Sequence, residues 1–94
     1  MTEAPRTTFK CRVTEVRLES ASAGRQLWQV ALDQTMFTPG DSGELLAVAR
    51  SGARLLLTVL RVDLELSGTV WHLVDKPVAE GTELTASVIR PALL

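Results

Sequence analysis

Cysteine is nearly absent from this sequence, and that scarcity excludes several kinds of site. Cys11 stands alone, so no disulfide can form within the chain. A structural zinc site built on several thiolates is excluded for the same reason, and Cys11 is expected to be a small buried apolar residue. The single histidine, His72, has no partner His or Cys nearby in the sequence. We therefore predict no metal and no cofactor.

Long apolar runs and charge of one sign are also missing. The longest apolar run, residues 55–60, is interrupted by Thr58, whereas a membrane-spanning helix needs roughly 18 apolar residues. The opening residues MTEAPRTTF lack the apolar core of a signal peptide, so we expect a cytoplasmic protein. Ten basic and eleven acidic residues give a net charge of -1. That balance argues against a dedicated duplex-DNA binder, which usually carries a marked basic excess.

What the sequence does contain is alternation of apolar and polar residues, the pattern of half-buried strands. The pattern begins at Phe9, and its phase slips by one residue at Thr14 and Glu15, which predicts a β-bulge. A second alternating segment includes Trp28, which is expected to fill the core. It follows the small-residue stretch ESASAGRQ, read as a hairpin loop, so the first two strands are expected to pair antiparallel.

Two Ser-Gly pairs, at 51–52 and 67–68, divide the second half of the chain and predict tight hairpin turns. Between them, the even-numbered residues 56–66 are apolar with one exception, and the odd-numbered ones are apolar only at the start. We predict a strand with one apolar face throughout, buried on both sides in its first half. The last strand is expected at 82–90, with three inward-facing side chains: Leu84, Ala86 and Val88.

These segments predict a mainly β, small single-domain antiparallel β-barrel of five to six strands, OB-like or SH3-like. A flexible N-terminus is expected over residues 1–7, the barrel over 8–91 and a C-terminal tail over 92–94. A short helix at 43–50 is the alternative to a strand there, because Asp41 and Glu44 resemble a capping box ahead of ELLAVAR.

Residues 40–43, Gly-Asp-Ser-Gly, resemble the nucleophile motif of chymotrypsin-like serine proteases. In that family the catalytic His and Asp precede the Ser, whereas His72 here follows Ser42. Pro39 and Gly40 suit the central positions of a type II turn, which needs φ > 0 at its third residue. We interpret the motif as a turn in which Asp41 or Ser42 binds a nearby backbone N–H, and we predict no catalytic residue.

The tail EGTELTASVIRPALL, residues 80–94, is similar to the end of molybdate-binding Mop/TOBE domains. In those domains a turn leads into a strand that ends the fold. The Ser-Ala-Arg-Asn opening typical of that family is not found here. We interpret the likeness as a shared β-strand pattern.

Partner binding is the function that these residues favour, with five candidates: Met36, Phe37, Arg50, Arg54 and Trp71. Met36 and Phe37 lie in a loop as a candidate apolar anchor, with a Phe37 ring folded back over the barrel as the alternative. Arg50 and Arg54 flank one expected turn and are candidates for a modest basic strip, with dispersed solubilising charge as the alternative. Trp71 is a candidate stacking residue. The alternation around it does not decide whether its side chain faces the core or the solvent.

The sequence therefore predicts a small non-enzymatic protein-binding module that engages a larger protein through loops or an edge strand. Accessory subunits and inhibitors from phages or other mobile elements are chains of this size. The alternative is an OB-like protein that binds single-stranded nucleic acid through exposed aromatic and basic residues. Pairing of two copies through an edge strand is left open.

Overall fold

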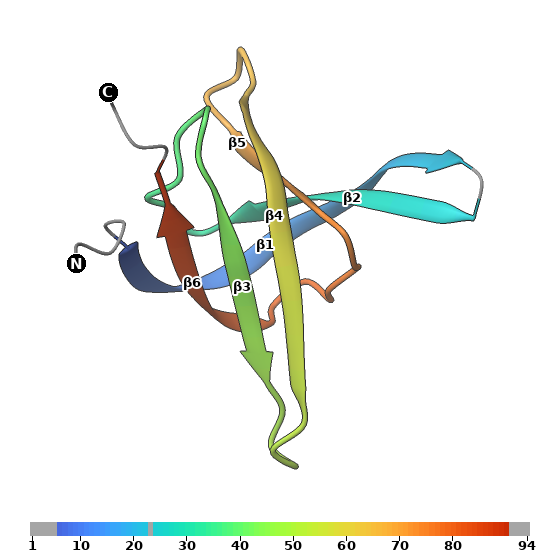
Figure 1. Ribbon diagram of the computed structural model, residues 1–94, viewed down its shortest axis with the longest axis vertical. Coiled ribbons are helices and arrows are strands. Elements are labelled where there is room, and N and C mark those ends of the chain that lie inside the picture. Colours follow the sequence, from blue (N-terminus) through green and yellow to red (C-terminus); the bar gives the residue numbers. More distant parts are fainter. Residues whose placement is uncertain (1–5, 23, 91–94) are drawn as a thin grey trace, which may run out of the picture.

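Six antiparallel strands make up the computed structural model, which describes residues 6–22 and 24–90 (Figure 1). Each strand pairs with two neighbours in the order β1-β2-β5-β4-β3-β6, and β6 pairs with β1 to close the barrel. The predicted small antiparallel barrel is thus confirmed, with six strands. Their bounds are β1 (Arg6–Ser22), β2 (Arg25–Leu32), β3 (Ser42–Val48), β4 (Arg54–Leu64), β5 (Val70–Val74) and β6 (Glu83–Ile89).

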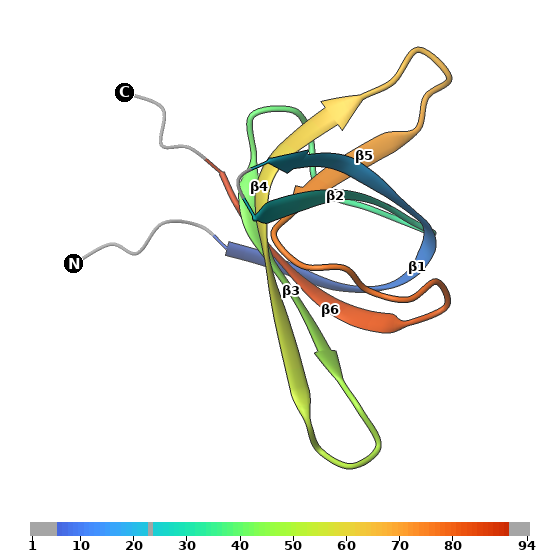
Figure 2. The ribbon, with the colours of Figure 1, turned by 90° about the vertical axis from the view of Figure 1, so that its right-hand side faces the viewer.

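The connections follow a Greek key. Strands β3, β4 and β5 are consecutive neighbours joined by hairpin turns, and β6 returns to lie beside β3. Two longer connections, residues 33–41 and 75–82, join strands that are not adjacent in the barrel. The hairpin β1–β2 and the hairpin β3–β4 both project beyond the closed part of the barrel as arms (Figures 1 and 2).

The core is filled by one face of each strand, as the alternation predicts. Leu84, Ala86 and Val88 of β6 are buried as expected, and Trp28 packs against the core while staying half-buried. The predicted bulge in β1 is confirmed by a register shift between Val13 and Glu15 against β2. A bulge bends its strand, and this one lies where β1 stops pairing with β6 and continues into the arm.

The element boundaries differ from the prediction at both ends of β1. Arg6 and Thr7, expected in the flexible terminus, belong to β1 and pair with β6. The other residues expected to be flexible, 1–5, and the tail 92–94 lie outside the described residues. β1 also extends to Ser22 and β2 begins at Arg25, so much of the expected loop ESASAGRQ forms the β1–β2 arm instead.

Residues 42–48 form β3, so the helical alternative for 43–50 is wrong. β3 is held on both sides, by β4 and by β6, and the two ladders outweigh the helical propensity of ELLAVAR. Gly43 sits at the tightest place: a Cβ there would overlap the Ser87 carbonyl and lie 2.9 Å from the Phe37 ring. The second glycine of the Gly-Asp-Ser-Gly motif therefore serves close packing of β3 against β6.

The prediction that the first half of β4 is buried on both faces is wrong. Leu57 and Val59 are buried, whereas Leu56 and Leu60, predicted to be on the buried face, are 45% and 48% exposed. A register shift between Val59 and Arg61 changes the face, so the buried side chain beyond it is Val62. Strand β4 is not buried on both sides because no second layer covers its outer face.

Candidate functional site

The β3–β4 hairpin leaves the barrel because its outer neighbours end before it does. β6 pairs with β3 only as far as Leu46, opposite Thr85, and β5 pairs with β4 only from Val59 onward. Between these limits, β3 and β4 pair only with each other, as far as Val48 and Arg54. We call residues 47–58 the β3–β4 arm (Figure 2).

The tip of this arm is a three-residue turn, as the Ser-Gly pair at 51–52 predicts. Ala49 N–H donates to the Ala53 carbonyl at 2.8 Å and Gly52 N–H to the Ala49 carbonyl at 2.9 Å, with φ at Gly52 of 90°. The positive φ favours glycine at this position of the turn. Arg50 and Arg54 therefore flank one turn, as predicted, and both are exposed.

The outer face of the arm is apolar and uncovered. Leu46 lies directly opposite Leu56, and Val48 lies opposite Arg54 on the same face. Side chains on neighbouring positions of paired strands contact one another, so these residues form one continuous surface. Val48 is 57% exposed and Leu46 is half-buried. Leu46 is the last residue of β3 before the arm, and together with Val48 and Leu56 of the arm it makes up what we call the arm face.

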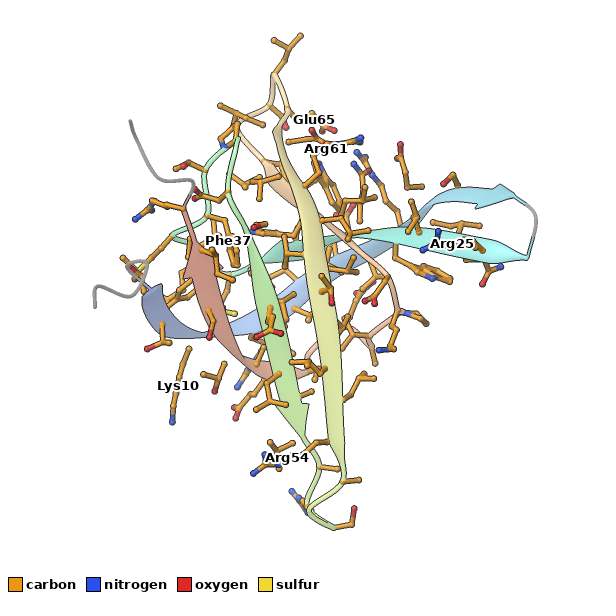
Figure 3. The ribbon with its side chains drawn as sticks, in the orientation of Figure 1. Lys10, Arg25, Phe37, Arg54, Arg61 and Glu65 are labelled. Atoms are coloured by element: carbon orange, nitrogen blue, oxygen red, sulfur yellow. The ribbon has the colours of Figure 1, made fainter. Side chains whose placement is uncertain are left out.

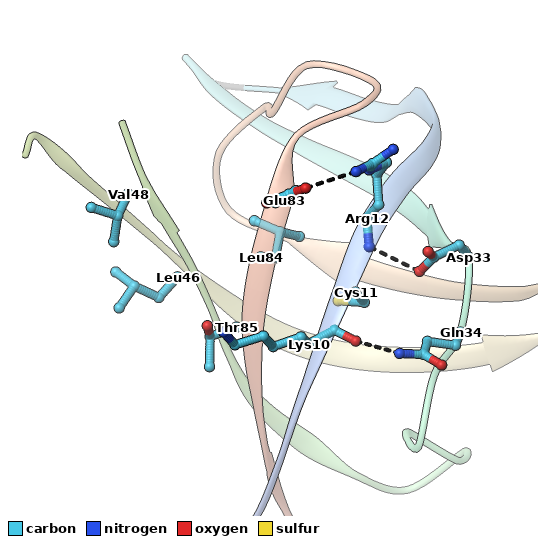
Figure 4. A pocket seen from close by; sticks show the side chains of 10 residues that line it. All are labelled: Lys10, Cys11, Arg12, Asp33, Gln34, Leu46, Val48, Glu83, Leu84 and Thr85. Atoms are coloured by element: carbon cyan, nitrogen blue, oxygen red, sulfur yellow. Dashed lines mark hydrogen bonds and ion pairs between the residues drawn. The ribbon is translucent and has the colours of Figure 1, made fainter. Parts of the chain in front are cut away.

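A groove of about 430 Å³ adjoins the arm face where β3 and β6 diverge (Figure 4). Leu46 and Val48 form its apolar side. The polar side is held by an Arg12–Glu83 ion pair at 2.7 Å and by Arg12 N–H, which donates to Asp33 Oδ1 at 2.9 Å. The remaining lining residues are Lys10, Cys11, Gln34, Leu84 and Thr85.

Around this surface three cations and one carboxylate, that of Asp33, take part in no ion pair within the described chain, so the charge left unbalanced is positive overall. Among the residues that the structure describes, Lys10, Arg50 and Arg54 take part in no ion pair, whereas Arg12 is paired with Glu83. Figure 3 shows Lys10 and Arg54 pointing outward, while Phe37 lies inside the barrel. An apolar face bordered by free cations can contact a partner that is both apolar and acidic.

The inner side of the arm faces the 75–82 connection across an apolar trough of about 350 Å³. Two side chains from this connection bind the free backbone of β4. Asp75 Oδ1 accepts from Thr58 N–H at 2.9 Å, and Lys76 Nζ donates to the Leu56 carbonyl at 3.0 Å. The edge of β4 in the arm is thus partly capped by side chains.

Phe37 is not an exposed anchor; the alternative, a ring folded into the barrel, is right. It is only 2% exposed and makes edge-on contacts with Phe9 and His72, at centroid distances of 5.8 and 5.0 Å. Met36 is exposed as expected, and its carbonyl accepts from Arg90. Both residues lie in the 33–41 connection, at the opposite end of β3 from the arm tip.

Trp71 is also buried, so the expectation of an exposed stacking residue is wrong. It is 3% exposed, with the Arg17 guanidinium carbon 3.8 Å from the ring centroid. Arg17 also donates to Gln29 Oε1 at 2.6 Å and to Glu65 Oε2 at 3.0 Å. Trp71 pairs with Asp63, at the far end of β4 from the arm. The structure brings Arg50 and Arg54 together but places Met36, Phe37 and Trp71 elsewhere.

The Gly-Asp-Ser-Gly motif forms the predicted turn. Asp41 N–H donates to the Thr38 carbonyl at 3.0 Å, φ at Gly40 is 100°, and Asp41 Oδ2 accepts from Thr38 N–H at 2.8 Å. Ser42 begins β3 and is exposed. Asp41 therefore caps its own turn, as one of the two predicted residues.

His72 is fully buried with both ring nitrogens engaged. Because a carbonyl only accepts, Nδ1 carries the proton and donates to the Val30 carbonyl at 2.8 Å. Nε2 then accepts from the Thr35 hydroxyl at 2.8 Å, and the Thr35 oxygen accepts from Phe37 N–H at 3.0 Å. Burial lowers the pKa of His72, opposed by the hydrogen bond to Val30. This network holds the 33–41 connection against the core.

Cys11, the remaining reactive side chain, lines the groove but is buried. Burial, together with the nearby Asp33 carboxylate, raises the pKa of its thiol to about 11. Within residues 6–22 and 24–90, no three metal-ligating side chains gather at one place. The same residues include no helix long and apolar enough to cross a membrane.

Leu46, Val48 and Leu56 were missed as candidate binding residues, although a signal for them exists. Residues 55–57 are apolar on both faces of one strand, and a strand of a single-layered barrel buries only one face unless another segment covers its outer side. Without such a cover, either the odd-numbered or the even-numbered side chains of this segment must be exposed. The sequence alone does not say which set, because the β-bulge in β4 changes the alternation along the strand.

Comparison with known proteins gives no relative: no protein family, no curated protein and no solved structure matches this chain.

Proposed function

We propose that this chain is a small non-enzymatic protein-binding module that contacts its partner through the β3–β4 arm. The observation that carries the proposal is the arm face, an exposed apolar surface on a hairpin outside the barrel. Arg50 and Arg54 border it at the tip without ion-pair partners among the described residues. Acting in the cytoplasm, as an accessory subunit or inhibitor of a larger protein, is part of this proposal.

Two physical arguments support the arm as the contact element. Apolar side chains gathered on one exposed face mark interaction sites more often than isolated exposed ones do. Val48 and Leu56 are both about half exposed or more, and each lies beside another apolar or basic side chain of the face. Arginine is enriched in protein interfaces because it combines a broad apolar surface with directional hydrogen bonds.

The test compares two exposed leucines, Leu56 in β4 and Leu66 in the β4–β5 turn, the second serving as the control. Leu56→Glu places a charge in the arm face, whereas Leu66→Glu places the same charge in the exposed β4–β5 turn. A photoreactive residue at Ser51 captures proteins from host extract, and each captured band is compared among wild type and the two variants. A band lost only in Leu56→Glu is the expected result. Bands unaffected by Leu56→Glu, or lost equally in both variants, contradict the proposal.

Binding of single-stranded nucleic acid by an OB-like barrel is the alternative proposal. Three cations near the groove and the arm tip that have no ion-pair partner among the described residues, Lys10, Arg50 and Arg54, favour it, whereas the burial of Trp71 removes a stacking surface. Salt separates the two proposals. Affinity for a mixed-sequence oligonucleotide that falls steeply between low and moderate salt supports nucleic-acid binding, because counterions are released. No binding at low salt excludes it.

A further inference from the structure

Resting on the protein-binding role proposed above, we propose that the partner is an extended acidic peptide segment that adds as a strand between β3 and β6. We call the place where these strands diverge, beyond the Leu46–Thr85 pair, the β3–β6 split. Addition of a strand to an open sheet edge is a common mode of peptide recognition, in which backbone hydrogen bonds supply affinity.

The register shows that β3 presents a free backbone edge at the split. In an antiparallel strand, alternate residues direct N–H and C=O to the same side. Ala49 N–H donates to the carbonyl of Ala53, the residue before β4, so the backbone of Val48 points the other way, toward β6. The next position of the β3–β6 register would pair Val48 with Glu83, and no such pair forms.

The backbone of Glu83 faces the split from the opposite side. Val13 N–H donates to Thr82 O and Val13 O accepts from Gly81 N–H, which places Val13, and with it Cys11, on the β6-bonding side of β1. Cys11 pairs with Leu84. Leu84 therefore bonds toward β1, and Glu83 directs its N–H and C=O toward β3. Two strand edges thus face each other with no strand between them.

The split also has room and suitable walls for an added strand. The groove of about 430 Å³ is lined by residues of both edges, including Val48 and Glu83 (Figure 4). A neighbouring strand lies about 4.8 Å from the edge to which it bonds. With its backbone on Val48, its alternate side chains lie against Leu46 and Val48 on one face.

Two of the other free edges of the arms, those of β4 and β1, are obstructed. On β4, Thr58 N–H and the Leu56 carbonyl are already bound by Asp75 and Lys76. On β1, the arm is interrupted by two register shifts, between Val13 and Glu15 and between Leu18 and Ser20. Bulges twist an edge away from regular pairing. The β3 edge carries neither obstacle among the described residues.

Charge selects an acidic peptide over a second copy of this chain. The two acidic groups of the groove are engaged: Glu83 by the Arg12 side chain and Asp33 by Arg12 N–H. Arg50 and Arg54 at the tip are not paired within the described chain. Two copies pairing edge to edge through β3 would bring four such arginines together, and like charges disfavour that arrangement.

Amide hydrogen exchange followed by NMR tests the mode of binding directly. The probe is a soluble peptide of about eight residues with alternating Val and Glu, compared with its Val and Lys counterpart. In the free protein, the Val48 and Glu83 amides are expected to exchange quickly, while Ala49 is protected. Adding the Val-Glu peptide is expected to protect Val48 by about tenfold or more, and the Val-Lys peptide is expected to have no effect.

Two variants separate backbone pairing from side-chain contact. Val48→Pro removes the N–H that faces the split and leaves the β3–β4 ladder bonds intact, and proline is tolerated on an edge strand. Val48→Ala shortens the same side chain but keeps the N–H. We expect Val48→Pro to bind the Val-Glu peptide about fivefold more weakly than Val48→Ala, the effect of one backbone hydrogen bond. If Val48→Pro does not fold, Glu83→Pro against Glu83→Ala makes the same comparison from β6.

Each outcome decides one proposal. No protection of Val48 at about millimolar Val-Glu peptide, or equal binding by Val48→Pro and Val48→Ala, overturns strand addition. Equal or tighter binding of the Val-Lys peptide overturns the acidic partner, and protection of Val48 that depends only on protein concentration identifies a second copy instead. Loss of captured bands in Leu56→Glu but not in Leu66→Glu would still support the arm as a protein-binding element. The two proposals therefore fail separately.

Discussion

The two hairpin arms leave the same barrel, yet they are built by opposite rules. In the β1–β2 arm the pairing shifts twice along β1, and Glu15 and Glu19 are exposed charged residues on it. In the β3–β4 arm the pairing runs without a shift from Gly43 to Val48. Natural sheets protect edges with bulges and charges. The β1–β2 arm has both, and the β3–β4 arm exposes a regular apolar face instead.

The arms also differ in what fastens them to the barrel. Arg17 holds the β1–β2 arm through its contact with the Trp71 ring and its bond to Glu65 in the β4–β5 turn. The β3–β4 arm is held by Asp75 and Lys76, which bind backbone rather than side chains. Side-chain bonds to backbone at an edge leave the apolar outer face uncovered. The outer face of the β3–β4 arm is therefore the exposed surface on which the proposed contact depends.

Substitution of Gly43 at the root of the β3–β4 arm is expected to have the largest effect. Gly43→Ala forces a Cβ against the Ser87 carbonyl and the Phe37 ring. Moving either the backbone or a buried ring costs free energy. We expect the free energy of unfolding to fall by about 3 kcal/mol or more. Urea denaturation followed by circular dichroism measures this loss.

Gly24 in the turn of the β1–β2 arm supplies the control for this prediction. Its φ is 77° and nothing lies within 4 Å of a Cβ placed there, so Gly24→Ala meets only backbone strain of about 1 kcal/mol. Equal losses of stability in the two variants would show that the contacts around Gly43 add nothing to the backbone strain, which contradicts this prediction.

Removal of the Arg17 clamp is expected to be the next largest change. Arg17→Ala uncovers Trp71 and removes the bonds to Gln29 and Glu65, so we expect a loss of about 1.5 kcal/mol and a red shift of tryptophan emission. Arg17→Met keeps an apolar cover on the ring without the charge. Compared with Arg17→Ala, this variant should show a much smaller red shift of emission but should recover only part of the lost stability. An unchanged emission maximum in Arg17→Ala would mean that the guanidinium does not shield the ring.

Alternation in the sequence was enough to predict the barrel, because β3, β4 and β6 each turn one face to the core and the other to solvent. The bulge at Thr14, the turns at both Ser-Gly pairs and the buried residues of β6 were all predicted correctly. These features depend on residues close together in sequence. Local propensity and long-range pairing agree there, so the sequence pattern is reliable.

The candidate site was harder to predict because it depends on pairing between distant strands. The bulge in β4, between Val59 and Arg61, reverses the exposed face of that strand, and an apolar sequence on both faces does not reveal it. Phe37 and Trp71 are buried by contacts with Phe9, His72 and Arg17, each from another segment of the chain. The split between β3 and β6 depends on where two ladders end, which no local pattern encodes.

The pH dependence of stability tests the core from which both arms project. The pKa of His72 is lowered in the folded state by burial, so the unfolded chain binds more protons once the pH falls below about 6.5. Stability contributed by neutral His72 is therefore present above that pH and is lost as the pH falls toward the folded pKa. We therefore expect the free energy of unfolding to decrease as the pH falls from 7 to about 5.5.

His72→Gln is the control for this prediction because it does not titrate. Its stability is expected to be lower than that of wild type at pH 7 and nearly flat over the same interval, by urea denaturation at each pH. A wild-type loss that persists in His72→Gln would assign the pH dependence to other groups.

The smallest effect is expected from Asp75, which protects the edge of β4. Asp75→Ala removes the acceptor of the Thr58 amide and is expected to cost about 0.5 kcal/mol, since the bond is exposed. Asp75→Asn keeps an oxygen at that place and should lose less. Exchange of the Thr58 amide should quicken in Asp75→Ala but little in Asp75→Asn. Unchanged exchange in Asp75→Ala would mean that the β4 edge is as open as the β3 edge, and the preference for strand addition at Val48 would lose its structural reason.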